Sequence, residues 1–175
     1  MKEKRRYSAA AHHEKKGFII TGGYDGSRRL ASTEITKDGV TFEHFSPLPI
    51  ALQGHCVVAL NEDDDGDGGD FFVAGGASNS GNSKRAFIHK ISHWWVDVAE
   101  MSLGRRGKKP SLEIENEFIY LNHFIADLMC GPVRASPGGR IEKIVAAGGW
   151  LGSHNTYRTE VEIYDITGNA WATGA

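Results

Sequence analysis

Phe18-Ile19-Ile20-Thr21-Gly22-Gly23 is the stretch that decides the fold, because the same pattern occurs three times in the chain. The other copies are Phe71-Phe72-Val73-Ala74-Gly75-Gly76 and Lys143-Ile144-Val145-Ala146-Ala147-Gly148-Gly149. Apolar or β-branched residues that run into a double glycine predict a short strand that ends in a turn, since glycine allows backbone angles that other residues avoid. Three copies at comparable spacing predict a repeat architecture.

The distance between copies divides the chain into units. Gly22 and Gly75 are 53 residues apart, whereas Gly75 and Gly148 are 73 apart. We place the units at about 17–69, 70–142 and 143–175, with the additional residues in the second unit.

Each unit continues after its double glycine with a polar loop and further strand patterns. In the first unit, 30–36 alternates between apolar and polar residues, Lys37-Asp38-Gly39 is a hairpin turn signal, and 40–45 returns. Pro47-Leu48-Pro49 then interrupts the ladder before a further strand at 54–60. Three pairs of large residues, each seven apart, suit positions that pack one twisted sheet against the next: Ile35 and Phe42, Ile88 and Trp95, Tyr164 and Trp171.

An apolar run, Gly-Gly, a polar loop, a Tyr and Trp pair and a later Met-x-x-Gly-Arg segment together resemble the kelch repeat. The third copy matches best, through Gly148, Gly149, Tyr164 and Trp171. Met101-Ser102-Leu103-Gly104-Arg105-Arg106 matches the kelch segment before the next inner strand, whereas the first unit has Leu48 to Gln53 there and lacks the arginine. The amino-terminal residues 5–12 resemble the end of a preceding unit.

The kelch resemblance implies an all-β fold of four-stranded antiparallel blades around a central channel. At roughly 50 residues per kelch blade, the chain carries about three blades, fewer than the usual minimum of four for a closed propeller. We therefore expect a partial propeller, either a piece of a larger ring or an open array whose exposed edges need partners.

The additional residues lie at about 108–127, where the repeat pattern lapses. Apolar residues at alternating steps of four and three predict an amphipathic helix there: Ile114, Phe118, Leu121, Ile125 and Leu128. A retained intron is the alternative, because Gly107-Lys108-Lys109 can be encoded with a donor-like GTAAG and Ala126-Asp127 with an acceptor-like CAG. Sequencing of spliced transcripts distinguishes a genuine insertion from an intron.

Composition and charge limit the partners that we expect. Of the 175 residues, 40% are hydrophobic and 24% are charged, and the net charge of -2 gives no reason to expect nucleic acid or an anionic membrane as a partner. Residues 1–6 are basic, but no apolar signal-peptide region follows them and no apolar run is long enough to span a membrane. We predict a cytoplasmic protein with an unidentified protein partner.

Residues with metal-binding or reactive side chains give weak signals. Asp63 to Gly68 resembles the first half of a calcium loop, but Ala74 stands at the twelfth position, so a solvated hairpin loop is the preferred interpretation. His89 and His93 are expected in solvent, and His12-His13 as exposed residues rather than ligands. Cys56 and Cys130 are interpreted as small buried apolar residues without a disulfide framework. We predict no cofactor, no metal site and no catalytic residue.

The double glycines are assigned a structural role at strand ends, as are Phe42, Trp95, Tyr164 and Trp171, so binding is expected in the loops that follow the glycines. The resemblance favours a protein-interaction module, and the arginines are the candidates for an acidic partner. The alternative is the non-catalytic part of a propeller enzyme, or of a ubiquitin-ligase substrate adaptor whose other parts lie outside this chain. The predicted partner-binding residues are Tyr24, Arg28, Arg29, Asn79, Asn82, Arg105, Arg106, Trp150, His154 and Tyr157.

Overall fold

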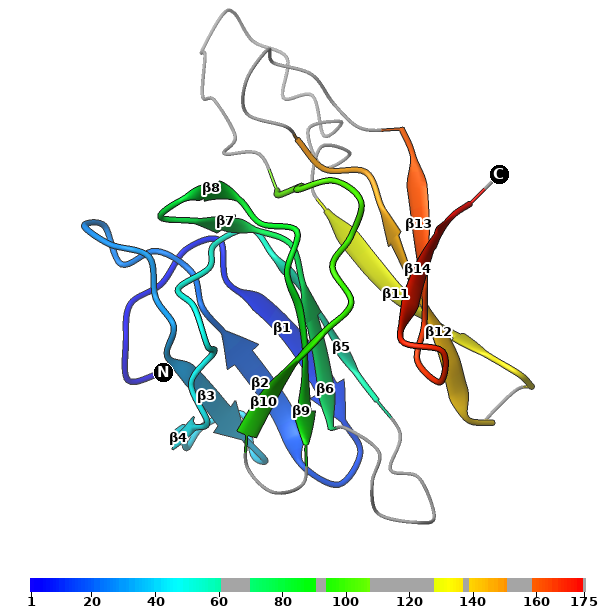
Figure 1. Ribbon diagram of the computed structural model, residues 1–175. Helices are drawn as coiled ribbons and strands as arrows, with labels where there is room; N and C mark the ends of the chain where they lie inside the picture. The colour runs from blue at the N-terminus through cyan, green and yellow to red at the C-terminus, as the bar shows by residue number, and fades with distance from the viewer. Residues whose placement is uncertain (61–69, 91–93, 108–127, 137–138, 151–158, 175) are drawn as a thin grey trace, which may run out of the picture.

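The fold consists of three four-stranded antiparallel sheets and one small hairpin (Figure 1). This computed structural model describes residues 1–60, 70–90, 94–107, 128–136, 139–150 and 159–174. Within these ranges every regular element is a strand, which confirms the predicted all-β class.

The strands of each sheet follow one another in the chain. Read from the edge that comes first in the chain, the first sheet has the order β1-β2-β3-β4, the second β5-β6-β9-β10 and the third β11-β12-β13-β14, and the hairpin pairs β7 with β8. The strands of the first sheet are Ala9–His13, Gly17–Thr21, Thr33–Thr36 and Glu43–Phe45 for β1 to β4. Those of the second sheet and the hairpin are Cys56–Ala59, Phe71–Ala74, Ala77–Ser78, Gly81–Asn82, Ala86–Lys90 and Trp94–Val98 for β5 to β10. Those of the third sheet are Met129–Arg134, Ile141–Ala147, Val161–Asp165 and Ala170–Thr173 for β11 to β14.

The three double-glycine strands β2, β6 and β12 occupy the second position of their sheets. The first position belongs to β1, β5 and β11, which come before the glycine strands in the chain. Each sheet therefore combines the last strand pattern before a double-glycine strand with the strands that follow it. The predicted hairpin of the first unit is present as β3 and β4, and the Asp38 carboxylate accepts backbone hydrogen bonds from Val40 and Thr41 in its turn.

Glycine is required at the ends of these strands for two reasons. Gly75 and Gly76 have φ values of 69° and 88°, which lie in the left-handed region. A Cβ at Gly75 would also lie 2.7 Å from the carbonyl oxygen of Arg105. The double glycines thus combine strand-end geometry with close packing, as the sequence predicts.

The first strands of the three sheets run side by side at the centre of the molecule (Figure 1). Next to these strands, the Gly54 N–H donates to the carbonyl of Tyr7, and the Gly107 N–H donates to the carbonyl of Gly54, both at 2.8 Å. Both hydrogen bonds join one sheet to the next in chain order. The described sheets do not form a closed ring.

Aromatic side chains pack each sheet against the one before it. The indole Nε1 of Trp95 donates to the Ser46 carbonyl at 2.9 Å, and that of Trp171 donates to the Ala99 carbonyl at 2.7 Å. This confirms the predicted packing role of both tryptophans. The spacing of seven holds for Trp171, which lies opposite Tyr164, but Trp95 lies opposite His89, six residues before it, and not opposite Ile88.

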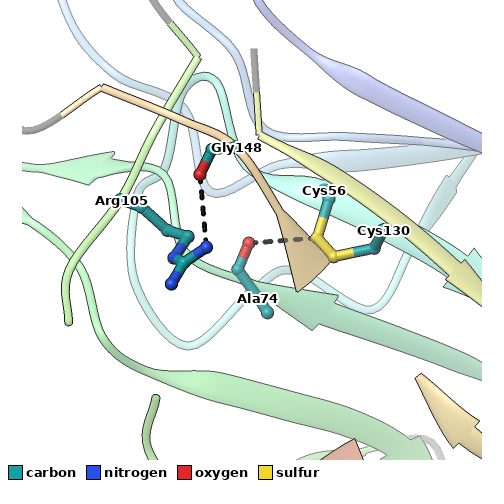
Figure 2. Close-up of a disulfide and its surroundings, with 5 residues drawn as sticks. All are labelled: Cys56, Ala74, Arg105, Cys130 and Gly148. Atoms are coloured by element: carbon teal, nitrogen blue, oxygen red, sulfur yellow. Dashed lines mark hydrogen bonds between the residues drawn. A yellow bond between two sulfur atoms is a disulfide. The ribbon is translucent and has the colours of Figure 1, made fainter. Parts of the chain in front are cut away.

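Cys56 and Cys130 form a disulfide, so their interpretation as unpaired small residues is wrong (Figure 2). The bond joins β5 of the second sheet to β11 of the third across a Cα separation of 5.7 Å. Their 74-residue separation gave no hint of this, because the contact depends on two first strands lying side by side. Disulfides are typical of oxidising compartments, so cysteine usage no longer supports the cytoplasmic assignment, which stays a prediction.

Two histidines expected in solvent are buried. His89 is inside the junction between the first two sheets, where its Nδ1 lies 3.0 Å from the Asp70 carboxylate, and Lys16 from the first sheet pairs with the same carboxylate at 3.1 Å. Burial of Asp70 raises its pKa, but the hydrogen bonds from His89 and Lys16 dominate and hold that pKa below its ordinary value. His13 is also buried, with its ring 5.7 Å from that of Phe71. Sequence reasoning missed both because it did not anticipate a neighbouring sheet at these positions.

Apart from two of the predicted binding residues, three sequence predictions fall outside the described residues. These are the acidic loop at 63–68, His93, and the helix predicted within 108–127.

Candidate interaction surface

The residues that come directly after the double glycines pair with the connecting segments between sheets. Isolated bridges pair Arg6 with Tyr24 and Arg106 with Trp150. In both pairs the second residue comes directly after a double glycine, so the glycine turn determines where its side chain begins.

Both pairs also stack a guanidinium group on an aromatic ring. The Arg6 guanidinium carbon lies 5.0 Å from the Tyr24 ring centroid, and that of Arg106 lies 4.5 Å from the Trp150 ring centroid. A guanidinium within about 6 Å of an aromatic face is attracted to the ring and keeps its edge free for an acceptor. The equivalent bridge in the second sheet is Gln53 with Ala77, which has neither group.

Two hydrogen bonds connect these pairs across the sheets. Arg29 of the first sheet donates from Nη1 to Asn79 Oδ1 of the hairpin at 3.3 Å. Asn82, on β8 of the hairpin, donates from Nδ2 to the Trp150 carbonyl at 2.9 Å. The hairpin therefore lies between an arginine of the first sheet and the tryptophan of the third.

We call this group the arginine surface. It contains six of the residues expected to bind a partner, together with Arg6. The members are Arg6, Tyr24, Arg29, Asn79, Asn82, Arg106 and Trp150.

Positive charge accumulates on this surface. Partial burial lowers the pKa of Arg106, and the nearby positive charge of Arg29 lowers that pKa further. Neither arginine has an ion pair with a carboxylate among the described residues. Two cations brought together without a carboxylate favour binding of an anion, since an anion relieves their mutual repulsion.

Arg28 lies beside the surface but its charge is already compensated. Its Nε lies 3.4 Å from the Asp25 carboxylate. Hydrogen bonds from the backbone N–H groups of Arg28 and Ser27 lower the pKa of Asp25 to about 2. The carboxylate is therefore ionised at neutral pH, and Arg28 is a weaker candidate than Arg29 for an acidic partner.

Arg105 is placed elsewhere, so we remove it from the predicted binding residues. Its side chain is fully buried and its Nη2 donates to Glu162 Oε2 at 2.5 Å. Its Nη1 donates to the Gly148 and Glu160 carbonyls at 3.3 and 3.0 Å, and Figure 2 shows the first of these bonds. Every one of these partners belongs to the third sheet or the loop within it, so Arg105 holds that sheet against the segment that precedes it.

Two predicted residues and one missed residue complete the comparison. His154 and Tyr157 lie outside the described residues. Arg6 was not predicted to bind, although its stacking on Tyr24 matches that of Arg106 on Trp150. The repeated Arg-Arg dipeptide at 5–6 and 105–106 was the signal for it, because both dipeptides place one arginine inward and the next on the surface.

The described residues contain neither a metal-binding cluster nor a membrane-spanning helix. Among the described residues, no group of three or more His, Cys, Asp or Glu side chains is arranged to hold a metal ion, and no helix there is long and apolar enough to cross a bilayer. Comparison with models of known protein families and with curated proteins found no match.

Proposed function

We propose that this chain is a kelch-type protein-interaction module whose three sheets are blades of a β-propeller. We further propose that the arginine surface binds an acidic segment of a partner protein. The proposal assigns binding to this chain and no catalytic residue.

The kelch part of the proposal is supported by repeated positions in the three sheets. Each sheet has a double-glycine strand second in order, and two of them use a tryptophan to reach the carbonyl of the preceding segment. A rigid scaffold of sheets with variable loops at one end is a common design for recognition.

The observation that carries the choice of ligand is the proximity of Arg29 and Arg106. The β7-β8 hairpin links them, since Asn79 accepts from Arg29 and Asn82 donates to the carbonyl of Trp150, whose ring lies under Arg106. The charge of Arg29 also lowers the pKa of Arg106. Guanidinium groups bind carboxylates in bidentate fashion, and such charge-assisted hydrogen bonds contribute about 1.5–3 kcal/mol each.

A peptide array tests this function. The arrayed peptides carry clusters of Asp and Glu, and each is matched by a peptide with Asn and Gln at the same positions. We expect binding to the acidic member of some pairs, and an affinity at least tenfold lower for the Arg29→Gln/Arg106→Gln double variant. Arg28→Gln is the matched control, because that arginine already has Asp25 as its partner. Equal binding of acidic and amide peptides, or full affinity of the double variant, would contradict the proposal.

A further inference from the structure

Each junction between sheets buries one face of each neighbour. We call the face toward the next sheet in chain order the trailing face, and the face toward the previous sheet the leading face. The trailing face of the second sheet packs with Ile144, Ala146 and Tyr164 of the third sheet in one hydrophobic cluster. The residues that the trailing face of the second sheet contributes to this cluster are all buried: Cys56, Val58, Leu60, Phe72, Ala74, Ala86 and Ile88.

The third sheet carries an apolar trailing face in the same register. Cys56 lies opposite Ala74, just before a double glycine, and Met129 lies opposite Ala147 in the same way. Aligning the two sheets on these pairs gives the third-sheet counterparts of the seven buried residues of the second sheet. They are Met129, Gly131, Val133, Val145, Ala147, Val161 and Ile163.

This second trailing face is less covered than the first, since Met129 and Val133 are exposed and its other five members are half-buried. Met129 is 66% exposed, whereas its counterpart Cys56 is 5% exposed. Val133 is 42% exposed, whereas its counterpart Leu60 is 5% exposed. A sheet face with the composition of an internal junction is thus partly open to solvent, and exposed apolar patches mark interaction sites.

The leading face of the first sheet is open at Phe18, although Glu34 and Thr36 on the same face are buried. Phe18 is 51% exposed, although its counterparts Phe71 and Ile144, each four residues before a double glycine, are both 0% exposed. The His12 ring lies 4.5 Å from the Phe18 ring, so two exposed rings stand together on this face.

We infer that the trailing face of the third sheet docks on the leading face of the first sheet of a second copy of this chain. The contact continues the register of the two junctions inside the chain, with the same positions facing each other. Such a head-to-tail contact forms a ring when its rotation closes. Two copies supply twice the three described sheets, and six blades fall within the four to eight of known propellers. The docking does not depend on the arginine surface, but closure as a ring rests on the proposed propeller.

The native disulfide supplies the design of a directional test. Cys56 lies on the trailing face of the second sheet and Cys130 on the leading face of the third. The counterpart of Cys56 is Met129, and the counterpart of Cys130 is Ala10, because Cys130 faces Ala146 and Ala10 faces Ile20, each two residues before a double glycine. Met129→Cys and Ala10→Cys therefore place two thiols across the inferred contact.

The two single variants are mixed and treated with oxidised glutathione, which accepts the two electrons as the two thiols lose their protons and form one disulfide. We expect a covalent dimer on a non-reducing gel that disappears with reductant. Ala11→Cys is the control partner for Met129→Cys, because the neighbouring position points to the opposite face of β1. A mixed pair that gives no more dimer than this control overturns the inference.

Light scattering on the unmodified chain gives an independent readout. We expect twice the mass of the 19.1 kDa chain at micromolar concentration, and a dimer dissociation constant at least tenfold weaker for Phe18→Glu. Val40→Glu, at an 82% exposed turn position, is the matched variant and should leave the dimer intact. A monomer at all concentrations overturns the docking, and larger open assemblies overturn the closed ring.

Discussion

Arg105 donates a hydrogen bond to Glu162 at 2.5 Å inside the junction between the second and third sheets, where both side chains are buried. The same arrangement occurs at the first sheet, where the buried Arg5 side chain donates to Glu34 at 2.7 Å. Arg5 also donates to the Gly22 carbonyl, as Arg105 does to that of Gly148. The ion pair is thus a repeated feature.

At the second sheet, an apolar pair takes the place of this ion pair. Leu52 takes the backbone position of Arg105, since the Gly23 N–H donates to the Leu52 carbonyl and the Gly76 N–H to the Arg105 carbonyl. Leu52 packs in a hydrophobic cluster with Phe87, which occupies the position of Glu162. The same backbone arrangement therefore accommodates either an Arg–Glu ion pair or a Leu–Phe apolar pair.

Removal of one member of the ion pair should be far more damaging than replacement of both. We expect Arg105→Leu to lower the free energy of unfolding by about 3–5 kcal/mol, because Glu162 is left buried without its cation. The Arg105→Leu/Glu162→Phe variant reproduces the Leu52 and Phe87 pair and should recover most of that loss. Urea denaturation measures all three proteins, and a double variant no more stable than the single one would contradict this explanation.

Gly75 gives a prediction in which backbone strain and steric clash can be separated. Gly75 and Gly39 have nearly the same φ, 69° and 73°. A Cβ at Gly75 would meet Leu128 Cδ2 at 2.4 Å, whereas a Cβ at Gly39 would meet nothing within 4 Å.

Gly39→Ala should therefore lose about 1–2 kcal/mol of stability from left-handed strain alone. We expect Gly75→Ala to lose at least twice as much, because the strain is joined by the clash. Thermal unfolding of the two variants tests this, and equal losses would show that the approach of the connecting segment does not require glycine.

The repeat pattern predicted the sheets because it depends on local residues. Apolar runs that end in double glycine encode strand and turn within six residues, so β2, β6 and β12 could be predicted from the sequence alone. Trp95 and Trp171 could also be assigned to the junctions, since large aromatic residues at repeated positions need a surface to pack on.

Contacts between sheets were harder to predict because their partners are distant in sequence. Whether Arg105 or Arg106 reaches the surface depends on which side of the segment faces Glu162. The disulfide and the burial of His89 depend in the same way on neighbouring sheets. A one-residue error in register also placed Ile88 where His89 lies, because a strand reverses its face at every residue.

His55 makes stability depend on pH. Its Nε2 lies 2.7 Å from Thr21 Oγ1 in the junction between the first two sheets, and burial lowers its pKa to about 4. The unfolded chain has a pKa near 6.5 at this residue and therefore binds the proton first as the pH falls. Stability from this residue is complete above pH 6.5 and is lost as the pH falls toward 4.

We expect the residue to account for a loss of about 2 kcal/mol between pH 8 and pH 5. Urea denaturation at both pH values measures the loss, which should be smaller by that amount in His55→Gln. His44→Gln, at an exposed position of β4, is the matched control and should keep the dependence of the parent chain. If the free energy of unfolding changes with pH equally in His55→Gln and in the parent chain, burial does not keep His55 neutral.

The disulfide should be a major source of stability for the junction between the second and third sheets. It closes a loop of 74 residues, for which the loss of chain entropy in the unfolded state corresponds to about 4 kcal/mol. We expect the Cys56→Ala/Cys130→Ala variant to lose a comparable amount in urea denaturation, and the reduced parent chain to unfold at the same urea concentration as that variant.

Alkylation with iodoacetamide followed by mass spectrometry controls for the state of the two thiols. The folded parent chain should take up no label until it is unfolded in the presence of reductant, and then two labels, since all of its cysteines are Cys56 and Cys130. Two labels on a chain unfolded without reductant would show that the bond is absent. In that case the stability of the parent chain and of the double alanine variant should differ only by the packing of two small side chains, which is typically below about 2 kcal/mol.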